Sequence, residues 1–231
     1  MSSQGTLAYS AYLFDLDGTL IDTAPDITAA LNRQLASLDL PPVPLDLVVT
    51  WVGTGSAQLI RTALTHSRSI ATHPEQQTEI ANEKMVARLL AAYADDYARR
   101  AVELSTPYAE AFSTLRTLHS RGAQLAIVTN KLSAIARNVL RHFAIDDLFS
   151  VLIGGDDVAK GKPDAMPLQE ACRRLNAIPA LTVMVGDSRN DVLAARAAGI
   201  DIIAVNYGYN HGEPIANAKP DRIIASLAEL L

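Results

Sequence analysis

The sequence contains little of several residue types, and each shortage excludes a class of protein. Only one of its 231 residues is a cysteine, Cys172, which excludes an internal disulfide and a zinc site built from cysteines. A single cysteine is typical of a protein kept in a reducing compartment. No apolar run approaches the roughly 20 residues that cross a bilayer, and residues 1–6 have neither the basic nor the apolar segment of a secretory signal. We therefore expect a cytoplasmic protein without a membrane partner.

Positive charge is also scarce. Twenty basic side chains accompany 25 acidic ones, which gives a net charge of −5. A nucleic-acid-binding domain usually carries a basic patch, so no nucleic-acid partner is expected. Apolar residues make up 49% and charged residues 19% of the chain, which is the balance of a folded globular protein. A chain of this length can bury a core in one or two domains without disulfides.

Short apolar segments alternate with helical segments in the second half of the chain. The pattern predicts strands at 124–129, 151–153, 182–186, 201–205 and 222–224, and helices at 109–121, 133–143, 165–176, 189–198 and after the last strand. Strands that alternate with helices of this length are typical of βαβ units. The second half therefore predicts an α/β fold with a parallel sheet.

The first half has a different pattern. One apolar strand is predicted at 9–15, and residues 22–100 have the pattern of helices separated by proline and glycine turns. A long helix is predicted at 75–100 because this stretch is rich in Ala, Leu, Glu, Lys and Arg and has no Gly or Pro. The simplest account is a parallel-sheet core with a helical domain inserted after its first strand.

Acidic residues follow the first predicted strand, in the segment Asp15–Thr19. Asp15 and Asp17 are two residues apart at the end of an apolar strand, where buried carboxylates are costly unless they have a function. They could be a nucleophile with an acid/base partner, a Mg²⁺ site, or solvated acids in a turn. A calcium loop of the EF-hand type is disfavoured because Asp26 occupies its twelfth position, where such loops have glutamate.

Two further polar clusters are ambiguous when each is considered alone. Thr129, Asn130 and Lys131 follow an apolar strand and could bind an anionic group or cap a helix. Lys162 precedes a proline, which restricts its backbone to extended conformations and places it in a loop. Its ammonium group suits a phosphoryl oxygen, but it could also be a surface lysine, and Lys160 is a competing candidate.

The fourth cluster follows the strand predicted at 182–186. Asp187 and Asp191 are one helical turn apart and could face one cation, although Ser188 and Asp191 also match a capping box. An open parallel sheet binds its ligands beyond the carboxyl ends of its strands, which is where all four clusters fall. We therefore expect the acids to converge on one cation, with Thr129 and Lys162 nearby.

The four clusters, in this order, resemble the motifs of the haloacid dehalogenase-like hydrolase superfamily. Phe14–Leu20 is similar to motif I, Thr129 with Asn130 to motif II, Lys162 to motif III, and Gly186–Asp191 to motif IV. The resemblance covers the chain apart from its first eight or so residues. It implies a Rossmann-like catalytic core and a helical cap domain. The implied boundaries are 1–21 plus 101–231 for the core and 22–100 for the cap.

The resemblance implies a two-step hydrolysis of a phosphomonoester. Asp15 would attack phosphorus and form an aspartyl-phosphate, while Asp17 would serve as the acid and then as the base. Thr129, Asn130 and Lys162 would stabilise the phosphoryl oxygens. The resemblance also implies Mg²⁺ as the cofactor. Its implied ligands are Asp15, the backbone carbonyl of Asp17, Asp187 and Asp191.

A narrower resemblance is to bacterial phosphoglycolate phosphatases. It rests on Asp22–Asp26, Trp51–Gly53, Val128–Lys131 and Tyr207–Asn210, while the proline-rich stretch that usually follows the motif III lysine is altered to Asp164–Pro167. The implied partner is a small phosphorylated metabolite, with 2-phosphoglycolate as the expected substrate. Arg61 and Lys131 are candidate cations for its carboxylate.

Two alternative functions remain open at this point, and two others are disfavoured. A phosphatase for a sugar or amino-sugar phosphate, such as N-acetylmuramate 6-phosphate, and a phosphosugar mutase fit the same motifs. A dehalogenase is disfavoured because it does not need the second acid, Asp17. A phospho-accepting receiver module is disfavoured because its sheet lacks a large helical insertion after the first strand.

Overall fold

The computed structural model describes residues 8–71, 83–100 and 102–231. Its main element is a six-stranded sheet in the order β5-β4-β1-β6-β7-β8, in which every neighbouring pair is parallel. The strands are β1 (Ala11–Phe14), β4 (Gln124–Val128), β5 (Val151–Ile153), β6 (Thr182–Gly186), β7 (Asp201–Val205) and β8 (Arg222–Ile224). The strand that comes first in the sequence thus lies in the middle of the sheet. The predicted α/β fold class is confirmed.

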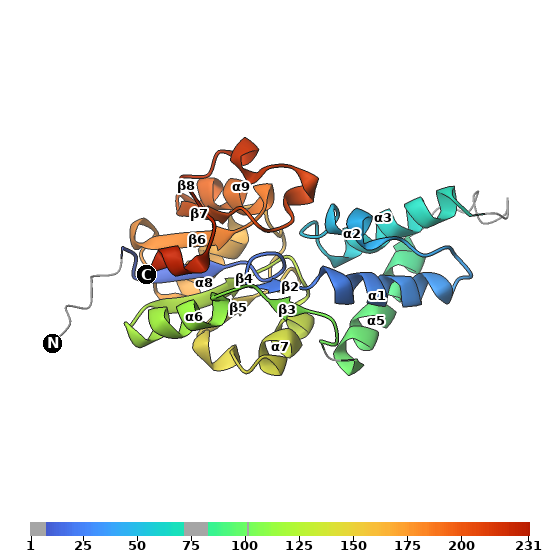
Figure 1. Ribbon diagram of the computed structural model, residues 1–231, viewed down its shortest axis with the longest axis horizontal. Helices are drawn as coiled ribbons and strands as arrows, with labels where there is room; N and C mark the ends of the chain where they lie inside the picture. Colours follow the sequence, from blue (N-terminus) through green and yellow to red (C-terminus); the bar gives the residue numbers. More distant parts are fainter. Residues whose placement is uncertain (1–7, 72–82, 101) are drawn as a thin grey trace.

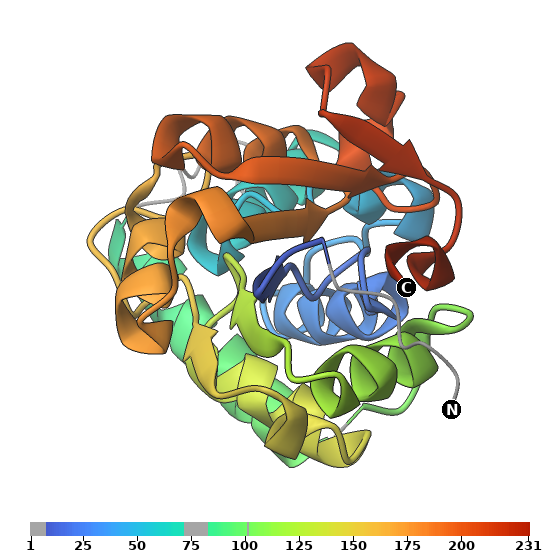
Figure 2. The same cartoon turned by 90° about the vertical axis from the view of Figure 1, so that its left-hand side faces the viewer.

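Helices cover both faces of this sheet (Figure 2). The side chains of β1 alternate between two cores: Ala11 and Leu13 pack with α8 and α9, and Tyr12 and Phe14 pack with α6 and α7. Burial on both faces explains why the strand is continuously apolar. The four helices are α6 (Ala111–Ser120), α7 (Ser133–His142), α8 (Met166–Leu175) and α9 (Arg189–Ala198).

A separate group of helices packs at one end of the sheet (Figure 1). These helices lie between β1 and β4 in the sequence, and their apolar faces pack on one another. They are α1 (Ala24–Ala36), α2 (Leu45–Val49), α3 (Ser56–Ser69) and α5 (Glu83–Arg99). The chain leaves the sheet through β2 (Ile21–Asp22) and returns through β3 (Thr106–Pro107), and these two short strands pair antiparallel. The predicted helical insertion after the first strand is present.

Several predicted elements differ from the structure in their extent. The strands at 151–153, 182–186, 201–205 and 222–224 and the helix at 189–198 are confirmed with their bounds. The predicted long helix is confirmed over Glu83–Arg99, while its positions 75–82 lie outside the described residues. The predicted terminal helix is wrong, because Leu227–Leu230 form only one 3₁₀ turn before the chain ends. The pair β2 and β3 was not predicted, because two-residue strands carry no readable periodicity.

Candidate active site

Three aspartates meet at the carboxyl end of the sheet. Asp15 follows β1, Asp187 follows β6, and Asp191 lies in the first turn of α9. One carboxylate oxygen from each lies within 4.8 Å of the other two. The residues are only 6%, 2% and 0% exposed, respectively. Because β1 and β6 are neighbours in the sheet, the convergence expected from the sequence follows directly from the topology.

This acid cluster is costly to ionise. Burial, followed by the neighbouring acids, raises the pKa of Asp15 to about 8, against the opposing effect of Lys162. Burial and the charge of Asp191 raise the pKa of Asp187 to about 7. Clustered carboxylates with raised pKa values favour a bound cation, and oxygen ligands suit Mg²⁺. The donor set therefore fits the predicted ion.

Lys162 supplies a buried positive charge beside the acid cluster. Its Nζ donates to Asp191 Oδ1 at 2.6 Å and to the Val128 carbonyl at 2.7 Å, and it lies 3.0 Å from Asp15 Oδ1. Burial alone would lower the pKa of Lys162, but the two acids outweigh it and raise that pKa. The competing candidate, Lys160, has a side chain that is 70% exposed at the surface. Of the two candidates, Lys162 is therefore the one that lies in this site.

Asp191 caps α9 and also reaches the acid cluster. Its Oδ2 accepts hydrogen bonds from the Ser188 backbone N–H at 3.0 Å and from the Ser188 hydroxyl at 2.7 Å, which completes a capping box for α9. Its Oδ1 accepts from the buried lysine. The capping bonds fix the direction of the Asp191 side chain, so the second carboxylate oxygen faces the acid cluster.

Asp17 lies in a different environment. Among the described residues, the clustered carboxylates do not include the Asp17 side chain, and the expected contact of its backbone carbonyl with the ion stays a prediction. Its Oδ1 accepts from Lys131 Nζ at 2.8 Å and from the Thr23 hydroxyl at 2.5 Å. The Lys131 side chain is 3% exposed, and its Nζ lies 5.0 Å from the centre of the Tyr97 ring. Lys131 and Thr23 thus fix the position of the Asp17 carboxylate.

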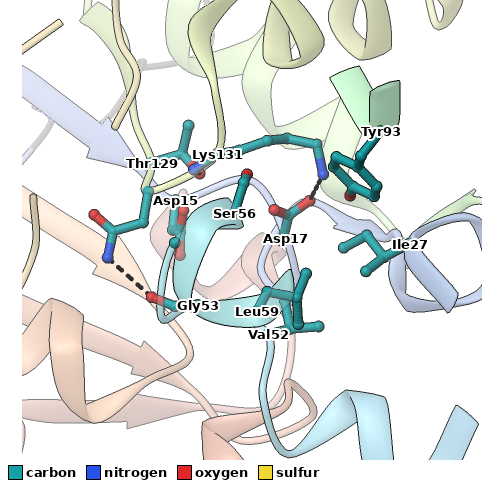
Figure 3. Close-up of a pocket in the computed structure, with 12 residues that line it drawn as sticks. Asp15, Asp17, Ile27, Val52, Gly53, Ser56, Leu59, Tyr93, Thr129 and Lys131 are labelled. Carbon is teal, nitrogen blue, oxygen red and sulfur yellow. Dashed lines mark hydrogen bonds and ion pairs between the residues drawn. The ribbon is translucent and has the colours of Figure 1, made fainter. Parts of the chain in front are cut away.

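A small pocket lies between these acids and the inserted helices (Figure 3). Its volume is about 30 Å³, which is room for two or three water molecules. The helical side of the pocket is formed by α1, the turn before α3, α3 itself and α5. The side that belongs to the sheet is formed by Asp15, Asp17, Thr129, Asn130 and Lys131. The pocket therefore joins the two predicted catalytic acids to residues of the insertion.

Thr129 and Asn130 differ in how much of their side chains is free. Thr129 Oγ1 accepts only from the Lys131 backbone N–H, at 3.2 Å, among the described residues, so its hydroxyl proton is available to a ligand. The Asn130 amide nitrogen donates to the carbonyls of Lys162 and Gly53 at 2.7 and 2.9 Å, and its Oδ1 accepts from the Lys162 N–H at 2.8 Å. Asn130 thus positions Lys162, and its predicted contact with a phosphoryl oxygen stays a prediction.

The turn before α3 is held against the sheet by Asn130 and by two residues that the sequence did not identify as functional, Asn190 and His211. The Gly53 carbonyl accepts from Asn130 and, at 3.1 Å, from Asn190 Nδ2. His211 Nδ1 lies 3.1 Å from the Thr50 carbonyl. Gly53 has a φ of +95°, which a residue with a side chain rarely adopts. The glycine-rich composition of this turn was the available sign of its role.

Tyr209 connects the acid cluster to the start of the insertion. Its backbone N–H donates to Asp187 Oδ2 at 2.8 Å. Its hydroxyl accepts from the backbone N–H groups of Thr23 and Ala24, each at 2.9 Å, and donates to Asp22 Oδ1 at 2.6 Å. The hydroxyl therefore satisfies the N-terminus of α1, which has no capping bond from its own N-cap side chain. No chemical role was predicted for this tyrosine beyond the family resemblance.

The model of the haloacid dehalogenase-like hydrolases matches residues 12–205. The chain belongs to this family. A phosphoglycolate phosphatase from Pasteurella multocida is 39% identical over 218 residues, which are 94% of this chain and 95% of the relative. Phosphoglycolate phosphatase 1 from Pseudomonas aeruginosa is 40% identical over 219 residues, which are 95% of this chain and 77% of that protein.

Solved structures lead to the same family. The crystal structure of a predicted phosphoglycolate phosphatase from Haemophilus somnus is 32% identical, has a TM-score of 0.87, and matches over 98% of both chains. The structure of CbbY from Rhodobacter sphaeroides in complex with phosphate is 26% identical, has a TM-score of 0.78, and matches over 96% of both chains. The predicted resemblance and the prediction of a phosphatase-type enzyme are confirmed.

Only one of the two candidate cations for a substrate carboxylate lines the pocket. Arg61 lies on α3, where its guanidinium is 3.1 Å from the exposed Glu83, and it does not line the pocket. Lys131 does line the pocket. Residue spacing along α3 could not distinguish the outer face of this helix from the face turned to the site.

Among the described residues, no helix is both long and apolar enough to cross a bilayer.

Proposed function

We propose that this enzyme hydrolyses 2-phosphoglycolate to glycolate and phosphate with the help of Mg²⁺. The observation that carries this proposal is the pocket beside Asp15, whose volume is about 30 Å³ and whose wall includes the buried ammonium group of Lys131. A two-carbon anionic leaving group suits a small pocket with a buried ammonium group in its wall. The names of the relatives that share 39% and 40% of their aligned residues support the same substrate.

The chemistry proposed for the chain's own residues has two steps. A carboxylate oxygen of Asp15 attacks phosphorus, the ester P–O bond breaks, and Asp17 gives its proton to the departing glycolate oxygen. Water then attacks the aspartyl-phosphate and loses a proton to Asp17, and the bond between phosphorus and Asp15 breaks to release phosphate. Lys131 and Thr23 orient Asp17 for both transfers.

Three carboxylates and one backbone carbonyl are the proposed ligands of the predicted ion. Asp15, Asp187 and Asp191, together with the backbone carbonyl of Asp17, would hold Mg²⁺. When bound, the ion would neutralise the acids and polarise the phosphoryl group. Lys162 balances the charge of Asp15 and Asp191, and the Thr129 hydroxyl is free to donate to a phosphoryl oxygen.

The inserted helices have the position of a cap over this site. We propose residues 22–100 as the cap domain and residues 1–21 with 101–231 as the catalytic core. The bonds from Asn130 and Asn190 to the Gly53 carbonyl support this division, because they close the insertion over the pocket. A closed cap excludes water while the substrate is bound. We also propose that the enzyme works in the cytoplasm on this small metabolite.

A comparison of substrates on one enzyme preparation tests the proposal. The values of kcat/KM are measured with Mg²⁺ for 2-phosphoglycolate, glucose 6-phosphate and N-acetylmuramate 6-phosphate, with Asp15→Asn as the blank. We expect 2-phosphoglycolate to exceed both sugar phosphates by at least about tenfold, or ~1.4 kcal/mol of transition-state binding. A sugar phosphate that exceeds it by that factor would contradict the proposal, as would conversion of a hexose bisphosphate to its isomer at a higher rate.

A further inference from the structure

The helical side of the pocket carries two hydroxyl groups without hydrogen-bond partners. Ser56 is the first residue of α3 and is 9% exposed, and Tyr93 lies in α5 and is 2% exposed. Both line the pocket, and neither hydroxyl makes a hydrogen bond to any part of the chain that the structure describes. Polar groups at this depth are nearly always paired in folded proteins. Because both groups line the same pocket, both are available to a ligand bound there.

The backbone at the same place also offers donors. Gly55 precedes α3 and provides no side-chain cap, and the first turn of this 14-residue helix has no acidic residue. The N–H groups of a first helical turn lack partners within the helix, and the helix dipole places partial positive charge there. Ser56 is itself the first residue of this turn, so its hydroxyl and the free N–H groups belong to one wall of the pocket.

Lys131 contributes a full positive charge to the same pocket. Its Nζ donates to Asp17 at 2.8 Å, and among the described residues it has no second acceptor, so two of its three protons are free. Its ammonium end is turned toward the end of the pocket where Tyr93 lies (Figure 3), and its charge affects the Tyr93 hydroxyl. Burial raises the pKa of Tyr93, so its hydroxyl remains protonated and able to donate.

The rest of the pocket wall shows which chemical group these donors suit. Ile27, Val52 and Leu59 are apolar, and the Gly53 carbonyl is already bound by two asparagine side chains. Lys131 and the N–H groups of the first turn of α3 can only donate, and the hydroxyls of Ser56 and Tyr93 can donate as well as accept, so apart from the two catalytic acids the wall is richer in donors than in acceptors. A sugar hydroxyl needs an acceptor as well as a donor, whereas a carboxylate only accepts.

We infer that Ser56 and Tyr93 bind the substrate carboxylate together with Lys131 and the N-terminus of α3, and so determine specificity. This inference rests on the function proposed above. It assigns the recognition of the leaving group to the cap, while the residues of the sheet bind the phosphoryl group. Neither hydroxyl belongs to a motif that the sequence singled out, because an isolated Ser or Tyr in a helix has no distinguishing pattern.

Two substrates that differ only in the carboxylate test this inference. The first is 2-phosphoglycolate, and the second is 2-hydroxyethyl phosphate, which replaces the carboxylate by a neutral CH₂OH group. The ratio of their kcat/KM values is measured for the wild type, Ser56→Ala, Tyr93→Phe and the double variant. We expect each single variant to lower the ratio about tenfold, mainly through the KM for 2-phosphoglycolate, and the double variant to lower it further. Ser56→Asp adds a negative charge and should lower the ratio more than Ser56→Ala.

Matched controls separate recognition from a general effect on the fold. Ser69→Ala lies at the opposite end of α3, and Tyr9→Phe removes a hydroxyl that bonds Asp201 on the sheet. Both controls should keep the wild-type ratio. Ser56→Ala and Tyr93→Phe each remove a single oxygen atom, so if one of them proves unstable in thermal unfolding, the other carries the test.

The outcomes of this test distinguish a failure of the proposed subsite from a failure of the proposed function. A wild-type enzyme that prefers 2-phosphoglycolate, with variants that keep this preference, would overturn the assignment of the subsite and leave the proposed function standing. A wild-type enzyme with no preference for the carboxylate substrate would overturn both. A preference that falls in Ser56→Ala and Tyr93→Phe but not in their controls is the expected result.

Discussion

Without a bound metal ion, the folded protein should lose stability as pH rises from 6 to 8. Burial is the largest cause that raises the pKa of Asp15 to about 8 and that of Asp187 to about 7, whereas an unfolded chain has aspartate pKa values of about 3.9. Between these limits the folded state holds more protons than the unfolded state. Stability is therefore greatest below the folded pKa values and falls as each acid ionises.

The size of the effect follows from the number of protons. One proton of difference changes the free energy of unfolding by about 1.4 kcal/mol per pH unit. The folded protein holds nearly two extra protons at pH 6 and about half of one at pH 8. Integration over this interval gives a loss of about 3 to 4 kcal/mol, which is a large part of the stability of an average domain.

Urea unfolding in the presence of a chelator measures this loss. The free energy of unfolding is determined at pH 6, 7 and 8 for the wild type and for Asp15→Asn, whose amide does not titrate. The variant should lose somewhat more than a third as much, and saturating Mg²⁺ or Ca²⁺ should flatten the dependence for the wild type. A wild-type stability that is constant or rises over this range in chelator would refute the reasoning, and so would equal slopes in the two proteins.

Three further substitutions test separate parts of the site. Lys131→Met should raise the KM for 2-phosphoglycolate at least about tenfold, whereas Arg61→Met, on the outer face of α3, should not; equal values would contradict the role of Lys131. Asp17→Asn should abolish turnover but keep Mg²⁺ binding in calorimetry, because only its backbone carbonyl is expected to touch the ion. Asn190→Ala removes one hydrogen bond to Gly53, a change of about 1 kcal/mol, and should raise KM about fivefold; an unchanged KM would show that this bond does not hold the cap.

The parallel sheet and its acid cluster could be predicted because the relevant signals are local. The strands β5, β6, β7 and β8 are short apolar runs bounded by glycines and polar residues, so even their end residues were predicted. Asp15, Asp187 and Asp191 each follow such a strand or begin the next helix. In a parallel sheet, the carboxyl ends of all strands lie at the same edge. The position of these acids required no further information.

Contacts between distant segments could not be predicted in the same way. Lys131 and Asp17 are 114 positions apart, and their pairing depends on β1 and β4 being neighbours in the sheet and on the direction of both side chains. The Asn130 amide donates to the carbonyls of Lys162 and Gly53 because its side chain points toward them, and the direction of a side chain cannot be read from the sequence. Arg61 was considered for the pocket because its charge was suitable, but the turn of α3 places it outside.

The phosphorylation of Asp15 by 2-phosphoglycolate is the most direct test of the account. The enzyme is mixed with the substrate and Mg²⁺, quenched during the first turnovers, and treated with borohydride, which reduces an acyl phosphate on aspartate to homoserine. Mass spectrometry of the digested protein should then find homoserine at position 15 and nowhere else, and Asp15→Asn should show neither homoserine nor turnover. Homoserine at another aspartate, or substantial turnover by a purified Asp15→Asn protein free of deamidation, would contradict the account.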